Sequence, residues 1–268
     1  DRFKGAVLHD TDETPEVFGP SDVPDLSDLL IIIPAWNEAE VIGHVLDELM
    51  ASLPDVDVLV VSDGSTDDTA RVARSHGATT LELPINLGVG GAMRAGYLYA
   101  LRGGYSFAAQ LDADGQHDPA DLPLLLGEAR DGRSDVVVGA RFAGKGEYKG
   151  SGPRKWAMRL MSVLLSPVVG ARLTDTTSGF KVSNRRAVEV FSREYPAEYL
   201  GDTIGALVLG AKAGISVSQV PVEMRARLGG EPSHGPFDSA RFLLRAWFAM
   251  AIAMTRPSAN RQKANDHA

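Results

Sequence analysis

Residues 29–65, LLIIIPAWNEAEVIGHVLDELMASLPDVDVLVVSDGS, decide the fold. The stretch opens with a short apolar run at 29–34 and contains a second one at 56–63. Between them, apolar residues recur with helical spacing at 39–52. Two short apolar strands separated by a helix predict a β-α-β unit, whose strands run parallel inside a buried sheet.

The same alternation continues along the chain. Further strands are predicted at 78–83, 106–114 and 134–141, with helices at 67–77, 90–104 and 121–132. The second half predicts helices at 153–169, 184–192, 203–213 and about 237–255, and a strand at 215–224. The expected fold is α/β, with a mostly parallel central sheet, helices on both faces and C-terminal amphipathic helices.

Four of the predicted strands end in polar clusters. These clusters occupy residues 34–38, 63–65, 112–114 and 139–141. Ligands of parallel α/β sheets bind outside the carboxyl ends of the strands. Polar turns that recur at one sheet edge therefore predict a binding site there.

The turn in LDADGQHDP, residues 111–119, indicates the chemistry of that site. In a turn, the carboxylates of Asp112 and Asp114 can converge on one divalent ion. Hard oxygen ligands suit Mg²⁺ or Mn²⁺, which keeps positions open for substrate phosphates. Gln116 and His117 could add an oxygen or a nitrogen ligand. An isolated Asp-Ala-Asp is typical of a plain turn, but the full string after a buried strand favours a metal and diphosphate site.

Two other turns predict contacts to a nucleoside. Asp63 can accept hydrogen bonds from a nucleobase or ribose. Ser65, Thr66 or Asp67 can cap the next helix, and Ser65 or Thr66 is the expected cap. The stretch NLGVGGAMRAG at 86–96 lacks the spacing of a dinucleotide loop, because Met93 replaces the third glycine. We interpret it as a loop around Gly88 that lets backbone approach a nucleotide closely.

The composition excludes several functional classes. The chain has 268 residues, enough for one large α/β domain with an extension, and a formal net charge of −8. That charge argues against a nucleic-acid binder that neutralises phosphates. The absence of cysteine excludes disulfides, thiolate zinc sites and cysteine nucleophiles.

A local excess of positive charge follows the fifth predicted strand. Residues 141–159 contain six Lys and Arg against one Glu, and the apolar run 161–169 comes next. This pattern is typical of a helix on a membrane surface or at an anionic lipid head, and also of a core helix with a solvated end. No apolar stretch reaches the length of a membrane span. We expect a cytoplasmic protein, peripheral at the inner face of the membrane.

The predicted organisation has four segments. These are a flexible lead-in at 1–28, a catalytic domain at 29–236, an apolar helix at 237–256 and a disordered tail at 257–268. The apolar helix could lie at a membrane interface, pack on the core or form a homodimer, and the sequence leaves these open.

Seven ordered motifs resemble glycosyltransferase family two. They are IIIPAWNEAE (31–40), VVSDGSTDDT (60–69), NLGVGGAMRAG (86–96), LDADGQHDP (111–119), GAR (139–141), TDTTSGFK (174–181) and MRARLGGEPSH (224–234). The similarity is greatest to the dolichyl-phosphate mannose synthase and bactoprenol-phosphate glucosyltransferase branch. It implies a GT-A fold and a cell-envelope enzyme that transfers a hexose from a nucleotide sugar to polyprenyl phosphate, with inversion at the anomeric carbon.

The resemblance also implies roles for individual residues. It places the nucleoside at Pro34, Ala35, Asn37, Glu38 and Asp63, and the metal and diphosphate at Asp112, Asp114 and Gln116. It implies phosphate binding by Arg141, Arg154 and Arg227, and an acceptor-site turn at Ser178 and Gly179. The chain departs from relatives in two places. Asp202 stands alone where relatives usually carry paired acidic residues, and the last motif contains His234.

The acceptor is open between alternatives. A phosphate acceptor is largely a dianion near neutral pH and needs no general base. A hydroxyl on a soluble sugar or natural product needs one, for which Asp202 is the candidate, with Asp175 behind it. A non-catalytic nucleotide-sugar-binding subunit is disfavoured by the intact acidic loop and Arg141. The donor could be GDP-, UDP- or dTDP-linked.

Overall fold

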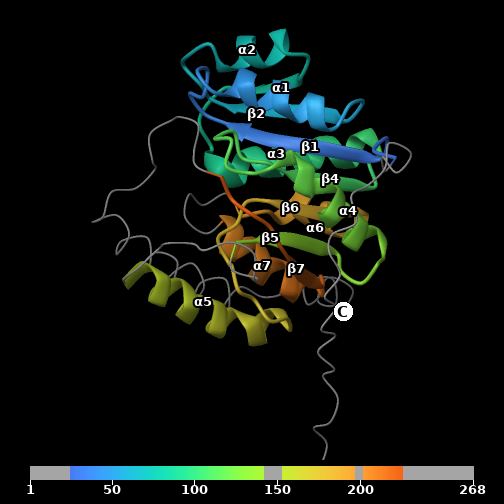
Figure 1. Cartoon of the computed structure of the whole chain (residues 1–268), viewed down its shortest axis with the longest axis vertical. Coiled ribbons are helices and arrows are strands. Elements are labelled where there is room, and N and C mark those ends of the chain that lie inside the picture. Colours follow the sequence, from blue (N-terminus) through green and yellow to red (C-terminus); the bar gives the residue numbers. More distant parts are fainter. Residues whose placement is uncertain (1–24, 142–152, 197–201, 226–268) are drawn as a thin grey trace, which may run out of the picture.

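The computed structural model describes residues 25–141, 153–196 and 202–225, without the side chains of 153–159 and 202. Seven described strands form one sheet in the order β3-β2-β1-β4-β6-β5-β7 (Figure 1). The strands are β1 (Leu29–Ala35), β2 (Asp57–Asp63), β3 (Thr79–Leu83), β4 (Phe107–Gln110), β5 (Val136–Ala140), β6 (Lys181–Asn184) and β7 (Val217–Pro221).

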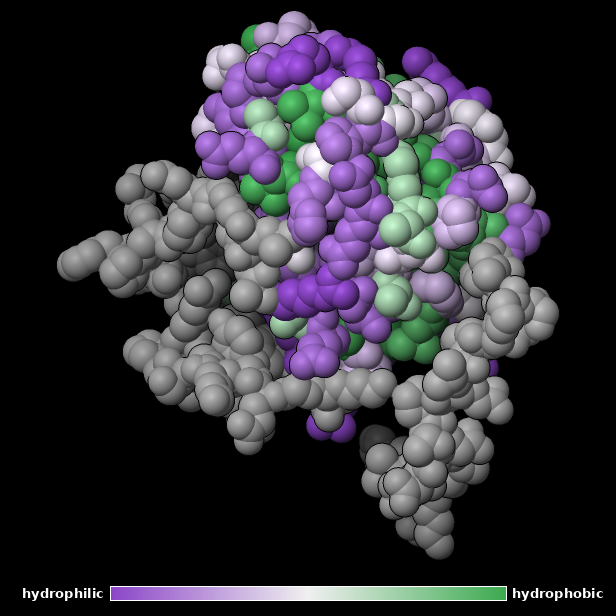
Figure 2. Space-filling view, turned by 45° about the horizontal axis from the view of Figure 1, so that its top comes forward, coloured by the Kyte–Doolittle hydropathy of each residue, from purple (hydrophilic) through white to green (hydrophobic). Residues whose placement is uncertain are grey.

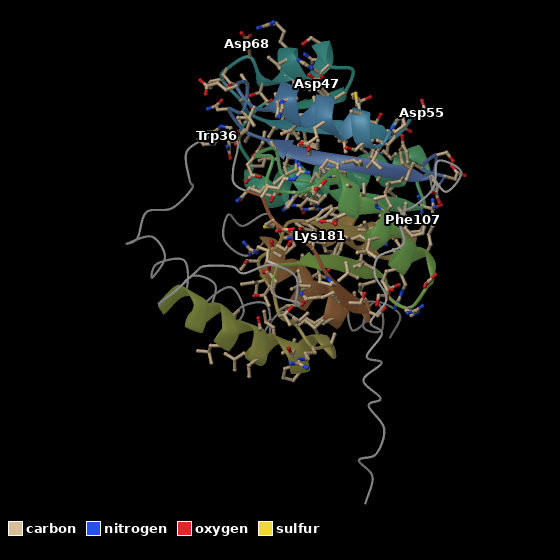
Figure 3. The ribbon with its side chains drawn as sticks, in the orientation of Figure 1. Trp36, Asp47, Asp55, Asp68, Phe107 and Lys181 are labelled. Atoms are coloured by element: carbon tan, nitrogen blue, oxygen red, sulfur yellow. The ribbon has the colours of Figure 1, made fainter. Side chains whose placement is uncertain are left out.

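Strand β6 is the antiparallel member of this sheet. It pairs antiparallel with β4 on one side and with β5 on the other, while the other described neighbours pair parallel. Because two antiparallel steps cancel, β5 and β7 run in the same direction as β1, β2 and β4. Figure 3 shows Trp36, directly after β1, at one end of the sheet and Phe107, which begins β4, at the other.

Helices cover both faces of the sheet. Side chains alternate across a strand, so Leu30 and Ile32 of β1 face one core while Ile31 and Ile33 face the other. The core around Ile31 includes residues of α1 (Ile42–Ser52), α2 (Thr69–Ser75) and α4 (Leu122–Arg130). The opposite core includes residues of α3 (Gly88–Gly103), α5 (Pro153–Val169), α6 (Arg185–Glu194) and α7 (Asp202–Lys212).

The predicted α/β fold with a mostly parallel sheet is confirmed, but one strand was missed. β6 consists of the residues Lys181–Asn184, of which only Val182 is apolar, so no strand pattern marks it. The strand expected at 106–114 ends at Gln110, which leaves Asp112 and Asp114 in the following turn. A short 3-10 helix, η1 (Pro119–Asp121), leads from that turn into α4.

Some predicted segments lie outside the described residues. These are most of the lead-in, the apolar helix at 237–256 and the tail at 257–268. The end of the lead-in is described and is anchored, because Leu26 is buried and Asp28 pairs with Arg130 at 2.6 Å. In the described part of the chain, no helix combines the length and apolar character that crossing a bilayer requires.

Candidate functional site

The turns that follow β1 and β2 are hydrogen-bonded to each other. Asn37 has a left-handed backbone with φ of 54°, and its Oδ1 accepts a hydrogen bond from the amide of Thr66 at 2.8 Å. The amide of Asn37 donates to the hydroxyl of Ser65 at 3.2 Å. The amide of Ala39 donates to Asp67 at 3.1 Å. Two of the predicted polar clusters therefore form one structural unit at the sheet edge.

The prediction that Ser65 or Thr66 caps the next helix is wrong. Asp67 makes that contact, since its Oδ1 accepts from the amide of Thr69, the first residue of α2, at 3.0 Å. Ser65 and Thr66 are instead engaged with Asn37 across the two turns. The cross-turn contacts cannot be read from the local sequence pattern, which indicates only that a capping residue is nearby.

Asp63 connects the end of β2 to the glycine-rich loop. Its Oδ1 accepts from the amide of Leu87 at 2.7 Å, and the side chain is buried. Burial raises the pKa of Asp63 above its usual value, although the amides of Leu87 and Gly88 oppose the rise. One carboxylate oxygen thus holds the start of α3, and a nucleoside contact by Asp63 stays a prediction.

Glycine is required where these loops meet. Gly64 has φ of 65°, and a Cβ there would lie 2.4 Å from the backbone nitrogen of Asn86. Gly88 has φ of 79° and donates its amide to Oδ1 of Asn86 at 2.9 Å. The close approach seen here is between two protein loops, and the approach of a nucleotide to Gly88 stays a prediction.

The acidic loop turns sharply after β4. Oδ1 of Asp112 accepts from Nε2 of Gln110 at 3.1 Å, and Oδ1 of Asp114 accepts from the amide of Gln116 at 3.0 Å. The amide of Asp112 donates to Nδ1 of His117 at 3.1 Å. The Asp112 side chain is 36% exposed, so its carboxylate reaches the surface of the site.

These side chains fit a hard divalent ion that also binds substrate. No group of three or more His, Cys, Asp or Glu in the described residues could enclose a metal. Mg²⁺ is commonly held by one or two carboxylates together with substrate phosphates, and that donor set matches Asp112 and Asp114. His117 is not available through Nδ1, which accepts the Asp112 amide, and its side chain is buried. This hydrogen bond disfavours His117 as the nitrogen ligand that the sequence suggested.

The turn before β6 lies directly against the acidic loop. A Cβ on Gly179 would lie 2.6 Å and 2.7 Å from the two carboxylate oxygens of Asp112. The neighbouring Ser178 is buried, and its hydroxyl has no hydrogen-bond partner among the described residues. The structure therefore brings the predicted donor loop and the predicted acceptor-site turn into contact.

Arg141, at the end of β5, forms a buried ion pair with Asp175. Its Nε lies 2.6 Å and its Nη2 3.1 Å from the Asp175 carboxylate, and Nη2 also donates to Thr177. Burial alone would raise the pKa of Asp175, but the hydrogen bonds and charge of Arg141 outweigh it and hold the pKa below its usual value. Asp175 is a paired, fully buried anion, so its suggested role as a reserve general base is wrong.

The last described residues cover the acidic loop from another side. The amide of Arg225 donates to the carbonyl of Gln116 at 3.0 Å, and its guanidinium pairs with Glu48 and Asp118. This contact with α1 was not predicted, because no local sequence pattern indicates it. Arg227 and the side chains of Arg154 and Asp202 lie outside the described residues.

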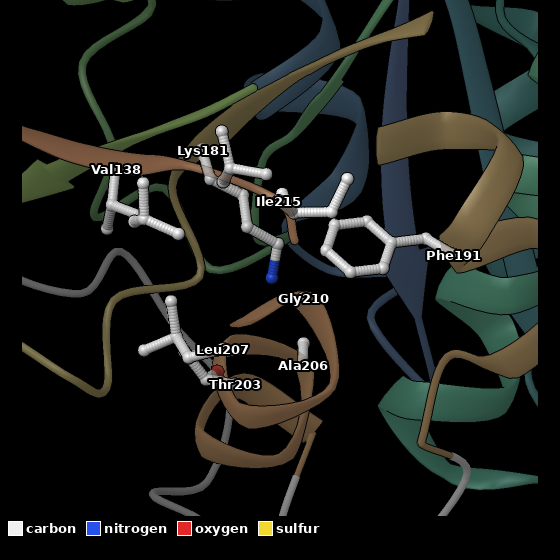
Figure 4. A pocket seen from close by; sticks show the side chains of 10 residues that line it. Val138, Lys181, Phe191, Thr203, Ala206, Leu207, Gly210 and Ile215 are labelled. Carbon is white, nitrogen blue, oxygen red and sulfur yellow. The ribbon is translucent and has the colours of Figure 1, made fainter. Parts of the chain in front are cut away.

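A small cavity lies between the sheet and α7, away from the acidic loop. Its volume is about 10 Å³, which accommodates at most one water molecule and no sugar or nucleotide. Figure 4 shows the amino group of Lys181 directed into it, and Lys181 donates to the hydroxyl of Tyr195 at 2.7 Å. The candidate site is instead at the carboxyl edge of the sheet, where Trp36 and the Asp112 side chain are exposed. Figure 2 shows a band of hydrophilic side chains between apolar patches on one face of the molecule.

Residues 30–191 match the family model described as Glycosyl transferase family 2. The chain belongs to this family. The predicted membership of this family is therefore confirmed, and so is the prediction of a glycosyltransferase that uses a nucleotide sugar. The match includes the turns at 34–38 and 63–65, the acidic loop and the turn that contains Gly179.

Two relatives of this family 2 glycosyltransferase are named for mannosyl transfer that involves a polyprenyl phosphate. Undecaprenyl-phosphate mannosyltransferase of Micrococcus luteus is 32% identical over 213 residues, covering 76% of this chain and 86% of the relative. Polyprenol monophosphomannose synthase of Mycolicibacterium smegmatis is 31% identical over 185 residues, covering 63% of this chain and 66% of the relative.

A solved structure of similar fold is glucosyl-3-phosphoglycerate synthase from Mycobacterium tuberculosis, in complex with Mn²⁺, UDP and glucosyl-3-phosphoglycerate. The TM-score is 0.65 at 22% identity, over 86% of this chain and 81% of that one. This similarity confirms the predicted GT-A-like fold. At this level of identity it carries no statement about the substrates of the present chain.

Proposed function

We propose that this enzyme transfers a sugar from a nucleotide diphosphate sugar to a polyprenyl phosphate, with inversion and with Mg²⁺ or Mn²⁺. The relatives named for undecaprenyl-phosphate and polyprenol-phosphate mannosyl transfer support the acceptor class. The observation that carries the proposal is the contact between Asp112 and Gly179, because the first is expected to hold the donor diphosphate and the second belongs to the turn expected at the acceptor.

The donor would lie along the carboxyl edge of the sheet. Residues 34–38 and Asp63 would bind the nucleoside, and Asp112, Asp114 and Gln116 would hold the ion. When bound, a divalent ion neutralises negative charge on the leaving diphosphate. The Mn²⁺ complex of the similar-fold synthase is compatible with such an ion, and the choice between Mg²⁺ and Mn²⁺ is open.

The reaction is a single displacement. An oxygen of the acceptor phosphate forms a bond to the anomeric carbon while the bond from that carbon to the diphosphate oxygen breaks. The nucleoside diphosphate leaves, and the configuration inverts. No proton has to be removed, because the acceptor phosphate is largely a dianion near neutral pH.

The state of Asp175 favours a phosphate over a hydroxyl acceptor. A hydroxyl acceptor must lose its proton to a base. Asp175 is buried and held by Arg141, so it cannot serve, and only Asp202 remains of the two predicted candidates. A phosphate acceptor needs neither residue as a base.

The lipid acceptor implies peripheral attachment to the membrane, on the inner face. Helix α5 begins within the basic stretch at 141–159, and its Val163 and Val168 are exposed apolar side chains. Arg154, in the first turn of this helix, would meet the lipid phosphate. A basic helix with exposed apolar groups suits an anionic lipid surface.

Replacing Asp202 with asparagine is expected to leave transfer to polyprenyl phosphate within about twofold of the wild-type rate, because this acceptor needs no base. Loss of a general base would instead slow the reaction by about 10²–10⁴-fold. Initial rates are measured with a polyprenyl phosphate in detergent, together with donor affinity. A loss in that larger range, with donor affinity unchanged, would contradict base-free transfer to a phosphate acceptor.

A further inference from the structure

The Asp112 carboxylate is surrounded by groups that belong to neither the expected donor nor the expected ion. Gln110 donates to its Oδ1 at 3.1 Å. His117 accepts the Asp112 amide on Nδ1, and its Nε2 lies 3.7 Å from Oδ2 of Asp112. Gly179 presents its backbone to both oxygens, close enough that a methyl group would collide with them.

The supporting side chains are themselves held in place. Gln110 is the last residue of β4 and is 2% exposed. The His117 ring stacks on Phe180 with centroids 5.0 Å apart and an interplanar angle of 17°. A backbone amide can only donate, so Nδ1 of His117 carries the lone pair and the neutral ring has its proton on Nε2. That N–H lies on the side of the ring that is near the Asp112 carboxylate.

We propose that Gln110, His117 and Gly179 are positioning residues that fix the Asp112 carboxylate before the ion and the donor diphosphate bind. The inference rests on the proposed function, since it assumes that Asp112 binds the ion. Groups that orient a metal-binding carboxylate raise its affinity for the metal, because the carboxylate no longer has to be ordered when the metal binds. Loss of such groups commonly weakens metal binding by about 10–100-fold. None of the three residues has to touch the donor.

Gly179 offers the most selective probe. Its φ does not lie in the left-handed region, so its backbone conformation accepts an alanine. The nearest atoms to an added Cβ are those of the Asp112 carboxylate. Gly179→Ala should therefore displace this carboxylate. The matched control is Gly127→Ala on α4, where a Cβ would meet nothing within 4 Å.

Gln110→Met is an independent probe of the same carboxylate. Methionine has a similar length but donates no hydrogen bond to Asp112. Oε1 of Gln110 is buried without a hydrogen-bond partner among the described residues, so removing the amide leaves no new unsatisfied group at that atom. The variant should fold like the wild type and lose only the orientation of Asp112.

The experiment measures Mn²⁺ binding to the full chain with UDP, GDP or dTDP present and no acceptor, by electron paramagnetic resonance of free Mn²⁺. Gly179→Ala and Gln110→Met are each expected to bind Mn²⁺ about 10–100-fold more weakly, and Gly127→Ala to match the wild type. In an Asp112→Ala background, Gly179→Ala should cause no further loss, because the displaced group is absent.

The outcomes separate this inference from the proposed function. If wild type binds Mn²⁺ and both positioning variants bind it equally well, the positioning role is refuted while the proposed function stands. The positioning role is also refuted if Gly179→Ala weakens binding as much in the Asp112→Ala background as in the wild type. If the wild type binds no Mn²⁺ with any of the three nucleotides, the metal-dependent function fails and the inference fails with it.

Discussion

Asp114→Asn is expected to slow sugar transfer by about 10²–10³-fold, the usual loss when one group that stabilises developing negative charge is removed. Asparagine has the shape of aspartate, and its carbonyl oxygen can still accept the Gln116 amide that bonds Asp114 at 3.0 Å. The loop should therefore keep its conformation while losing one negative charge towards the ion. Initial rates at saturating donor and Mn²⁺ measure the effect, and thermal unfolding checks the fold.

Asp131→Asn is the matched control for this substitution. Asp131 follows α4, and its side chain is 53% exposed in a surface pair with Arg133. The same loss of one charge there should leave the transfer rate unchanged. If Asp114→Asn retained a rate similar to that of Asp131→Asn, the acidic loop would have no part in donor activation.

Arg141→Met is expected to lower the free energy of unfolding by about 3 kcal/mol at neutral pH. Removing one partner of a buried ion pair commonly costs about 3–5 kcal/mol because the other charge stays buried without compensation. The lower end applies here, since the amides of Thr177 and of residue 141 still donate to Asp175. Urea unfolding measures the loss. Arg133→Met, which breaks an exposed pair, should cost less than about 1 kcal/mol.

The effect of Arg141→Met should depend on pH in a defined direction. In the wild type the pKa of Asp175 is lowered from 3.8, so its stabilisation is complete above that value and decreases as pH falls towards the lowered pKa. Without Arg141, burial is opposed only by weaker bonds and the pKa of Asp175 should rise. Protonation then relieves the buried charge, so the destabilisation should shrink as the pH falls from 7 to 4. A loss that grew with acidity would contradict the buried-anion account.

The parallel part of the sheet could be predicted because its information is local. Each apolar run in β1, β2 and β5 is long enough to indicate a buried strand, and each ends in a polar cluster. β6 could not be predicted, since Lys181–Asn184 resembles a loop and becomes a strand through its pairing with β4 and β5. Its position depends on long-range contacts that a local pattern does not contain.

The candidate site was likewise predicted only as far as local sequence patterns allow. Sequence motifs indicated Asp112, Asp114 and Arg141 separately as charged groups near a diphosphate. They did not show that Arg141 pairs with Asp175, 34 residues away, and so Asp175 was considered as a base. They also did not indicate the contact of Gly179 with Asp112, because it depends on how β6 is inserted beside β4. Residue types predict chemistry, while the partners of each residue follow from the fold.

The proposed acceptor chemistry is tested most directly by comparing polyprenyl phosphate with the matching polyprenol. The labelled donor is whichever of the GDP-, UDP- and dTDP-sugars stabilises the chain against heat with Mn²⁺ or Mg²⁺. The predicted result is labelled lipid from the phosphate acceptor, none from the polyprenol, and loss of the product on adding EDTA. Equal transfer to polyprenol or to a soluble hydroxyl acceptor, or transfer that persists in EDTA, would contradict a metal-assisted displacement by a lipid phosphate.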